Sequence, residues 1–130
     1  MNNLPQTLTH LTFGCYFNQS VDKLPETLTH LTLGDKFNKS VNYLPKNIKN
    51  LKLMCDNNLI NKLPDHIKKL YVVFYAQEKF NKNIINLPTT IDEIVIENEF
   101  YKKYFKNIPF GVKFTFMSNK NNKLVKHYTY

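Results

Sequence analysis

The chain has 130 residues, of which 42% are hydrophobic and 14% aromatic, enough to build the core of one folded domain. All 18 basic residues are lysines, and the formal net charge is +8. The longest apolar run, residues 70–76, is far shorter than the ~18 residues of a membrane span. The first residues have neither the charged nor the apolar segment of a signal peptide. We therefore expect a soluble protein of the cytoplasm that does not insert into a membrane.

A repeated motif starts near the beginning of the chain and sets its organisation. A Leu-Pro pair, or Ile-Pro in the last unit, opens six units at residues 4, 24, 44, 63, 87 and 108, with spacings of 19 to 24 residues. The first two units share the pattern Leu-Pro-x-Thr-Leu-Thr-His-Leu-Thr-x-Gly-x-x-Phe-Asn-x-Ser-Val. Each unit contains a short segment resembling Leu11-Thr12-Phe13, whose alternation is typical of a β-strand. The expected strands are 11–13, 31–33, 51–53, 70–72, 94–96 and 112–116.

Repeats of this length bury their apolar residues only by stacking on one another. The sequence therefore predicts a leucine-rich-repeat-like β solenoid of about six short repeats, whose parallel sheet lies on the concave face and is roughly 25 Å long. The convex side is expected to be mostly irregular, with the prolines in extended connectors there. We assign residues 1–116 to the repeats and residues 117–130 to a C-terminal cap or basic tail.

The pattern Leu-Pro-x-x-Leu-x-x-Leu-x-Leu-Gly-x-x-Phe-Asn-x-x-Val resembles the FNIP repeat, a leucine-rich-repeat variant of amoebal and giant-virus proteins. The resemblance extends over nearly the whole chain but is complete only in the first two repeats, since Asn57 stands where Phe is expected and Tyr101 where Asn is. The fourth repeat also has four extra residues before Phe80-Asn81. The resemblance implies a repeat protein, in the host cytoplasm if it is viral. Some FNIP proteins are similar to ubiquitin-ligase adaptors that carry an F-box, and this sequence has none.

Asparagine and phenylalanine recur at fixed positions after the strands. Asn18, Asn38 and Asn58 are expected to form a ladder of buried amides that bond the backbone of the next coil. Beneath the ladder we expect an aromatic row of Phe17, Phe37, Phe80 and Phe100. In the third repeat, where Asn57 interrupts the row, Leu59 and Ile60 are the expected substitutes.

No pattern that supports catalysis is present, so we expect no enzyme activity and no cofactor. Cys15 and Cys55 occupy the same position two repeats apart, about 10 Å from each other, which is too far for a disulfide bond. His10 and His30 should lie side by side on neighbouring strands. The next residue in that column is Asn50 rather than a metal ligand, so an exposed pair is favoured over a metal site.

The remaining candidates are surface residues, and the leading hypothesis is a module that binds a protein partner. The ring of tyrosine and the aliphatic part of the lysine side chain offer contact area at the strand positions that face away from the core. The candidate binding residues of the concave face are Thr12, Thr32, Lys52, Lys69, Tyr71 and Val95. Phe74 and Tyr75, in the longer fourth repeat, would either cover the core or form an anchor loop.

Two further modes of association stay open. Residues 102–130 contain seven lysines and no acidic residue, whereas residues 1–101 contain eleven lysines against ten acidic residues. This basic end would bind nucleic acid or another anionic surface through Lys102, Lys103, Lys106, Lys113, Lys120, Lys123 and Lys126. The first repeat has no earlier coil in front of it, so self-association through its open edge is the other expectation.

Overall fold

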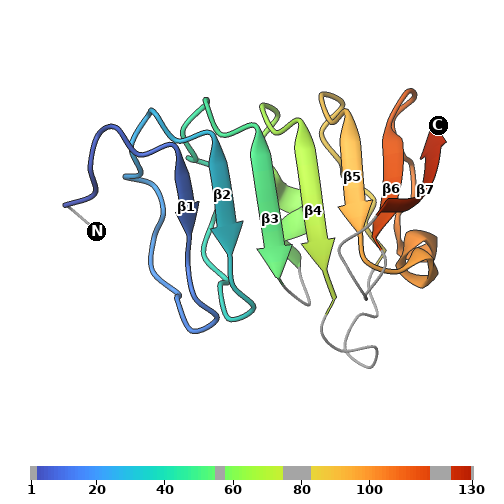
Figure 1. Ribbon diagram of the computed structural model, residues 1–130, viewed down its shortest axis with the longest axis horizontal. Helices are drawn as coiled ribbons and strands as arrows, with labels where there is room; N and C mark the ends of the chain where they lie inside the picture. The colour runs from blue at the N-terminus through green and yellow to red at the C-terminus, as the bar shows by residue number, and fades with distance from the viewer. Residues whose placement is uncertain (1–2, 55–57, 75–82, 118–123, 130) are drawn as a thin grey trace.

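The structure, a computed structural model, describes residues 3–54, 58–74, 83–117 and 124–129. Its main feature is a seven-stranded sheet whose strands follow chain order (Figure 1). Six strands are parallel, and the seventh lies antiparallel to the sixth. The strands are β1 (His10–Thr12), β2 (His30–Leu33), β3 (Asn50–Met54), β4 (Lys69–Val73), β5 (Glu93–Ile96), β6 (Lys113–Met117) and β7 (Leu124–Thr129). This arrangement confirms the predicted solenoid of stacked repeats, and each repeat is called a coil below.

The register between strands is the same from the first coil to the sixth. One row of paired residues crosses the six parallel strands and consists of Leu11, Leu31, Leu51, Leu70, Ile94 and Phe114. The register of coils three to six, which the eroded motif left open, therefore follows that of the first two. The extra residues of the fourth repeat fall between β4 and β5 and leave the sheet intact.

Each strand sends alternate side chains into the core, as the sequence pattern predicted. In β2, Leu31 and Leu33 are buried, whereas His30 is exposed and Thr32 half-buried. The inward residues of successive coils stack into one continuous apolar core. The outward residues form the other side of the sheet, which we call the open face.

The prolines lie in tight turns just before the strands rather than in extended connectors. In each coil the N–H of the residue three positions after the proline donates to the proline carbonyl, as Leu28 does to Pro25 at 3.1 Å and Ile48 to Pro45 at 3.0 Å. Pro25 and Pro45 are buried. The expected position was wrong because the turn-closing bond, which fixes the chain direction, is not visible in the Leu-Pro pair itself.

Polar side chains at the third position after the Leu-Pro leucine tie coils two, three and five to the coil before each of them. Their donors reach backbone carbonyls of the preceding coil: Thr27 Oγ1 to Gln6 (2.9 Å) and Leu8 (2.7 Å), Asn47 Nδ2 to Glu26 (2.6 Å), and Thr90 Oγ1 to Asp65. His66 occupies the same column and is hydrogen-bonded to the Pro45 backbone. These bonds were not predicted, although the recurrence of donors at this position is visible in the sequence.

The asparagine ladder is present in part but is not buried. The backbone N–H of Asn38 donates to Oδ1 of Asn18 at 3.0 Å, which is the coil-to-coil bond that was predicted. Asn18 is half-buried and Asn38 exposed, so the expectation of buried amides was wrong: this edge of the stack is open to solvent. Another asparagine, Asn61, makes more hydrogen bonds to the next coil, and these were not predicted from the sequence. Its Oδ1 accepts from the N–H groups of residues 85 and 86, at 2.8 and 3.1 Å, and its Nδ2 donates to the carbonyl of residue 83 at 3.1 Å.

Two short 3-10 helices, η1 (Asn58–Lys62) and η2 (Glu99–Tyr104), lie in the connections after β3 and β5. Leu59 and Ile60 of η1 are buried, as predicted for the coil that lacks a phenylalanine. Phe17 and Phe37 stack at 6.1 Å between ring centroids, but the row does not continue to Phe100, which is 49% exposed. No helix in the described ranges is long and apolar enough to cross a membrane.

The core position expected for Phe100 is filled by its neighbour. Tyr101 is only 6% exposed and stacks on Phe74 at 4.2 Å between ring centroids. Asn98 caps η2 by accepting from the Phe100 N–H at 2.9 Å, and the resulting turn directs residue 101 inward. Phe74 therefore packs in the core, which decides between its two predicted roles, whereas Tyr75 and Phe80 lie outside the described residues.

Candidate functional site

A groove crosses the open face of the sheet from β1 to β4. Its volume is about 330 Å³, and it is lined by His10, Leu11, Thr12, His30, Leu31, Thr32, Asn50, Leu51, Lys52, Lys69 and Tyr71. Five of the six residues predicted for this face therefore lie together. They do so because the in-register strands place equivalent positions side by side, for example Thr12 beside Thr32 and Lys52 beside Tyr71.

The sixth predicted residue, Val95, does not contribute accessible surface. It lies on the open face of β5 but is only 3% exposed. The neighbouring Thr115 on β6 is also 3% exposed. The open face is thus filled beyond β4, and the accessible groove ends near Tyr71.

His10 and His30 form a stacked pair at the β1 end of the groove. Their ring centroids lie 4.1 Å apart, the ring planes differ by 10°, and each Nδ1 is 2.9 Å from the hydroxyl of the preceding threonine. Burial lowers the pKa of His30 below its ordinary value of 6.5, and the charges of His10 and Lys69 act in the same direction. Stacked rings direct their nitrogen lone pairs along parallel lines, so this arrangement does not converge on one metal ion.

Among the described residues, no group of three or more His, Cys, Asp or Glu side chains could hold a metal ion. Cys15 is exposed and its thiol is free, whereas Cys55 lies outside the described residues. The predicted absence of a Cys15–Cys55 disulfide therefore stays a prediction.

Lys52 and Tyr71 form a contact at the β4 end of the groove. The Lys52 Nζ lies 4.6 Å from the centroid of the Tyr71 ring, within the range of a cation–π interaction. Burial raises the pKa of the Tyr71 hydroxyl above its ordinary value of 10.0, and the charge of Glu97 adds to this effect. At neutral pH Tyr71 therefore presents a protonated hydroxyl, a flat ring and an adjacent positive charge to anything bound in the groove.

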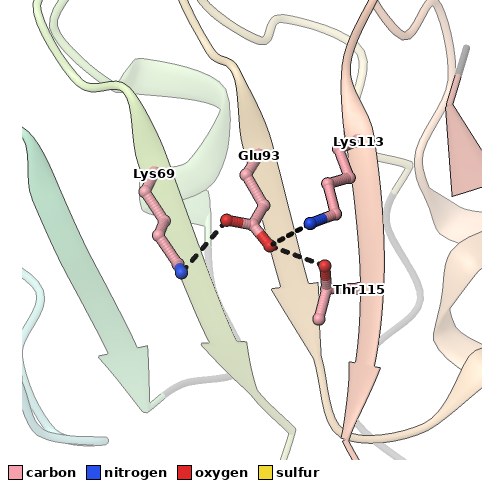
Figure 2. Close-up of polar contacts among 4 residues, drawn as sticks. All are labelled: Lys69, Glu93, Lys113 and Thr115. Atoms are coloured by element: carbon pink, nitrogen blue, oxygen red, sulfur yellow. Dashed lines mark hydrogen bonds and ion pairs between the residues drawn. The ribbon is translucent and has the colours of Figure 1, made fainter. Parts of the chain in front are cut away.

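Glu93 connects three strands at the far end of the groove (Figure 2). One carboxylate oxygen lies 3.0 Å from Lys69 Nζ, and the other accepts from Thr115 Oγ1 at 2.6 Å and lies 3.9 Å from Lys113 Nζ. Burial alone would raise the pKa of Glu93. The bonds from Thr115 and Lys69 and the two lysine charges outweigh burial, so this pKa lies below its ordinary value of 4.5. Lys69 and Glu93 are paired in register on β4 and β5, but the ion pairs were not predicted from the sequence.

The described lysines of the predicted basic end belong to different elements of the structure. Lys113 belongs to the sheet and pairs with Glu93. Lys103 lies on η2, with its Nζ 3.6 Å from the Phe100 ring centroid, and Lys102 Nζ lies 6.0 Å from that of Phe114. Lys106 is exposed. Lys120, Lys123 and the side chain of Lys126 lie outside what the structure describes.

Comparison with known proteins agrees with the repeat pattern. The FNIP Repeat family matches residues 1–36 and 17–56. No curated protein and no solved structure matches the chain. The matched residues include the two coils in which the motif is complete, and the structure continues the same strand register through coils three to six. Residues 1–56 are therefore FNIP repeats, and the coils that follow them stack in the same β solenoid.

Proposed function

We propose that this protein is a non-catalytic module that binds a protein partner through the groove on the open face of its sheet. The observation that carries the proposal is the convergence of outward side chains from four consecutive strands on one accessible groove. Neighbouring coils are fixed to one another by the sheet and by the Thr27 and Asn47 bonds, so the groove is held in shape before binding. A preformed surface loses little conformational entropy when a partner binds.

The chemistry of the groove suits a polar polypeptide segment. Its lining contains hydroxyl, amide, imidazole and ammonium groups beside the Tyr71 ring, and no lining residue is a carboxylate. Backbone carbonyls and acidic side chains of a partner would find donors at Asn50 and Lys52. Tyr71 offers a large contact area at a low entropic cost, as tyrosines do in many protein interfaces.

Nucleic-acid binding through the basic end has less support. Phosphate binding is strongest where several lysines lie along one surface. Lys113 lies on β6, where it pairs with Glu93, whereas Lys103 lies on η2 over the Phe100 ring of the same helix, so these two lysines belong to different elements and each already has a contact.

The test is a comparison of two double variants in affinity capture from cell extract. Lys52→Glu with Tyr71→Ala alters the β4 end of the groove. Lys46→Glu with Tyr43→Ala is the matched control, because both residues are exposed in the connection between β2 and β3, away from the groove. We expect quantitative mass spectrometry to find a protein retained by the wild type and the control but lost by the groove variant.

Capture is run with and without nuclease, and at two salt concentrations, to separate the partner classes. A captured protein that persists after nuclease treatment supports the proposal. The proposal fails if every captured component is nucleic acid or depends on it, or if the groove variant retains the same proteins as the control.

A further inference from the structure

We infer that two copies of this chain associate through coil one, with their β1 strands side by side and antiparallel. Coil one consists of residues 4–23, and β1 is an edge strand of the sheet (Figure 1). This edge adjoins the β1 end of the groove, which His10, Leu11 and Thr12 also line, but the inference does not depend on the proposed function.

Backbone groups of β1 are directed toward the open edge. The Phe13 N–H donates to the Thr32 carbonyl at 3.0 Å, and the Thr9 carbonyl accepts from the His30 N–H at 3.1 Å, so positions 9, 11 and 13 face β2. Backbone groups alternate in direction along a strand. The N–H and carbonyl groups of residues 10 and 12 therefore point away from β2, toward the side on which the described part of the chain places no strand.

Apolar side chains beneath this edge are incompletely covered. Leu8, Leu11, Phe13 and Phe17 are all partly exposed. Their equivalents in coil two, against which coil one packs, are fully buried: Leu28, Leu31, Leu33 and Phe37. A second layer against coil one would remove the remaining apolar surface from water, which favours association.

Coil one also lacks the features that keep edge strands apart. No charged residue occurs between Leu4 and Val21, and β1 contains neither lysine nor proline, the residues that commonly protect an open edge. Of the net charge of +8, all but one unit comes from residues 102–130, so two copies meet with least repulsion at coil one, which lies at the other end of the sheet. At Gly14 no atom lies within 4 Å of the position that a Cβ would occupy, so the approach is unobstructed.

With a two-fold axis beside Leu11, the outward backbone groups of both copies would make the same hydrogen bonds. Residue 10 of each copy would lie opposite residue 12 of the other, so that their outward N–H and carbonyl groups pair, and the two Leu11 side chains would meet beneath the strand. The other end of the sheet differs, because β7 lies antiparallel on β6. The geometry therefore points to a closed dimer through coil one rather than an open-ended chain of molecules.

The test is sedimentation of the full chain over a series from micromolar to millimolar concentration. Thr12→Pro removes the outward N–H but no hydrogen bond to β2, whereas Thr12→Val has a similar shape and keeps the N–H. We expect the wild type and Thr12→Val to approach twice the monomer mass as the concentration rises. Thr12→Pro should dissociate roughly ten to a hundred times more readily, because each dimer loses two backbone bonds.

Circular dichroism establishes that each variant is folded. Thr12→Lys, which keeps the backbone donor and adds a charge to the edge, is the second variant if proline unfolds coil one, and it should also weaken the dimer. The inference is overturned if the wild type stays monomeric at every concentration, or if Thr12→Pro and Thr12→Lys associate as tightly as the wild type. A mass that grows beyond the dimer contradicts the two-fold arrangement.

Discussion

Gly34 packs directly against Gly14 in the neighbouring coil. A Cβ atom added at Gly34 would overlap the Gly14 carbonyl oxygen and lie 2.7 Å from the Cα atom of Cys15. Both glycines occupy the same position of the repeat, but only Gly34 has a coil in front of it. The pair therefore gives a direct measure of how closely FNIP coils stack.

We expect Gly34→Ala to lower the free energy of unfolding by about 1–3 kcal/mol, because the methyl group forces two backbones apart. Gly14→Ala is the matched control and should change stability by less than about 0.5 kcal/mol, since its methyl group would contact nothing. Urea denaturation of both variants makes the comparison. Equal effects at the two positions would show that backbone contact does not set the coil spacing.

The positions of the strands could be predicted from the sequence, because a leucine or another apolar residue stands at the centre of every strand. The register of coils three to six was left open by the eroded motif, and the packing of the connections could not be predicted. Whether Phe100 or Tyr101 enters the core depends on the turn that Asn98 begins. The sequence pattern does not distinguish the two, because both are aromatic and adjacent. The burial of Val95 depends on its neighbours on other strands, and its own position in the repeat does not reveal it.

Asn61 should contribute more to stability than an ordinary surface asparagine. Replacing it with alanine removes an acceptor shared by two backbone N–H groups and a donor to a carbonyl of the next coil. We expect Asn61→Ala to lower the free energy of unfolding by about 1–3 kcal/mol. The exposed Asn42 is the control, and Asn42→Ala should have little effect. Equal denaturation midpoints for the two variants would show that the Asn61 bonds between coils do not stabilise the fold.

Acid should destabilise the fold through His66. Burial lowers the pKa of His66 below its ordinary value of 6.5, and the charges of Lys49 and Lys46 add to this, against smaller opposing effects of the Pro45 backbone and Asp65. The Nε2 atom is buried without a hydrogen-bond partner among the described residues. Protonation is therefore easier in the unfolded chain than in the folded protein.

The unfolded state consequently binds more protons than the folded state as the pH falls below about 6.5, and stability decreases down to the lowered pKa of the folded state. His66→Asn, which places the residue of the preceding coil at this position, should reduce the loss of stability between about pH 7.5 and about pH 5.5. Glu93 acts at lower pH, because its pKa lies below 4.5. An unchanged pH dependence in His66→Asn would assign the effect to another group.

The Glu93 ion pairs should respond to salt. Glu93→Gln removes the charge that Lys69 and Lys113 share and leaves an acceptor for Thr115. Since both lysines are partly exposed, we expect a loss of only about 0.5–1 kcal/mol at low ionic strength, and a smaller loss in concentrated salt. Glu26→Gln, at an exposed turn position, is the control. A loss that does not change with salt would mean that packing, rather than charge, links these strands.

The central claim is that the groove across β1–β4 binds a protein partner, and the most direct measurement is a calorimetric titration with the captured partner. We expect Tyr71→Ala to weaken binding by about tenfold or more, as truncation of a well-packed interface tyrosine does, and Tyr43→Ala to leave the affinity within about twofold. Both variants must have the denaturation midpoint of the wild type. Unchanged affinity in Tyr71→Ala, or a loss confined to Tyr43→Ala, would contradict the claim and move the binding surface away from the groove.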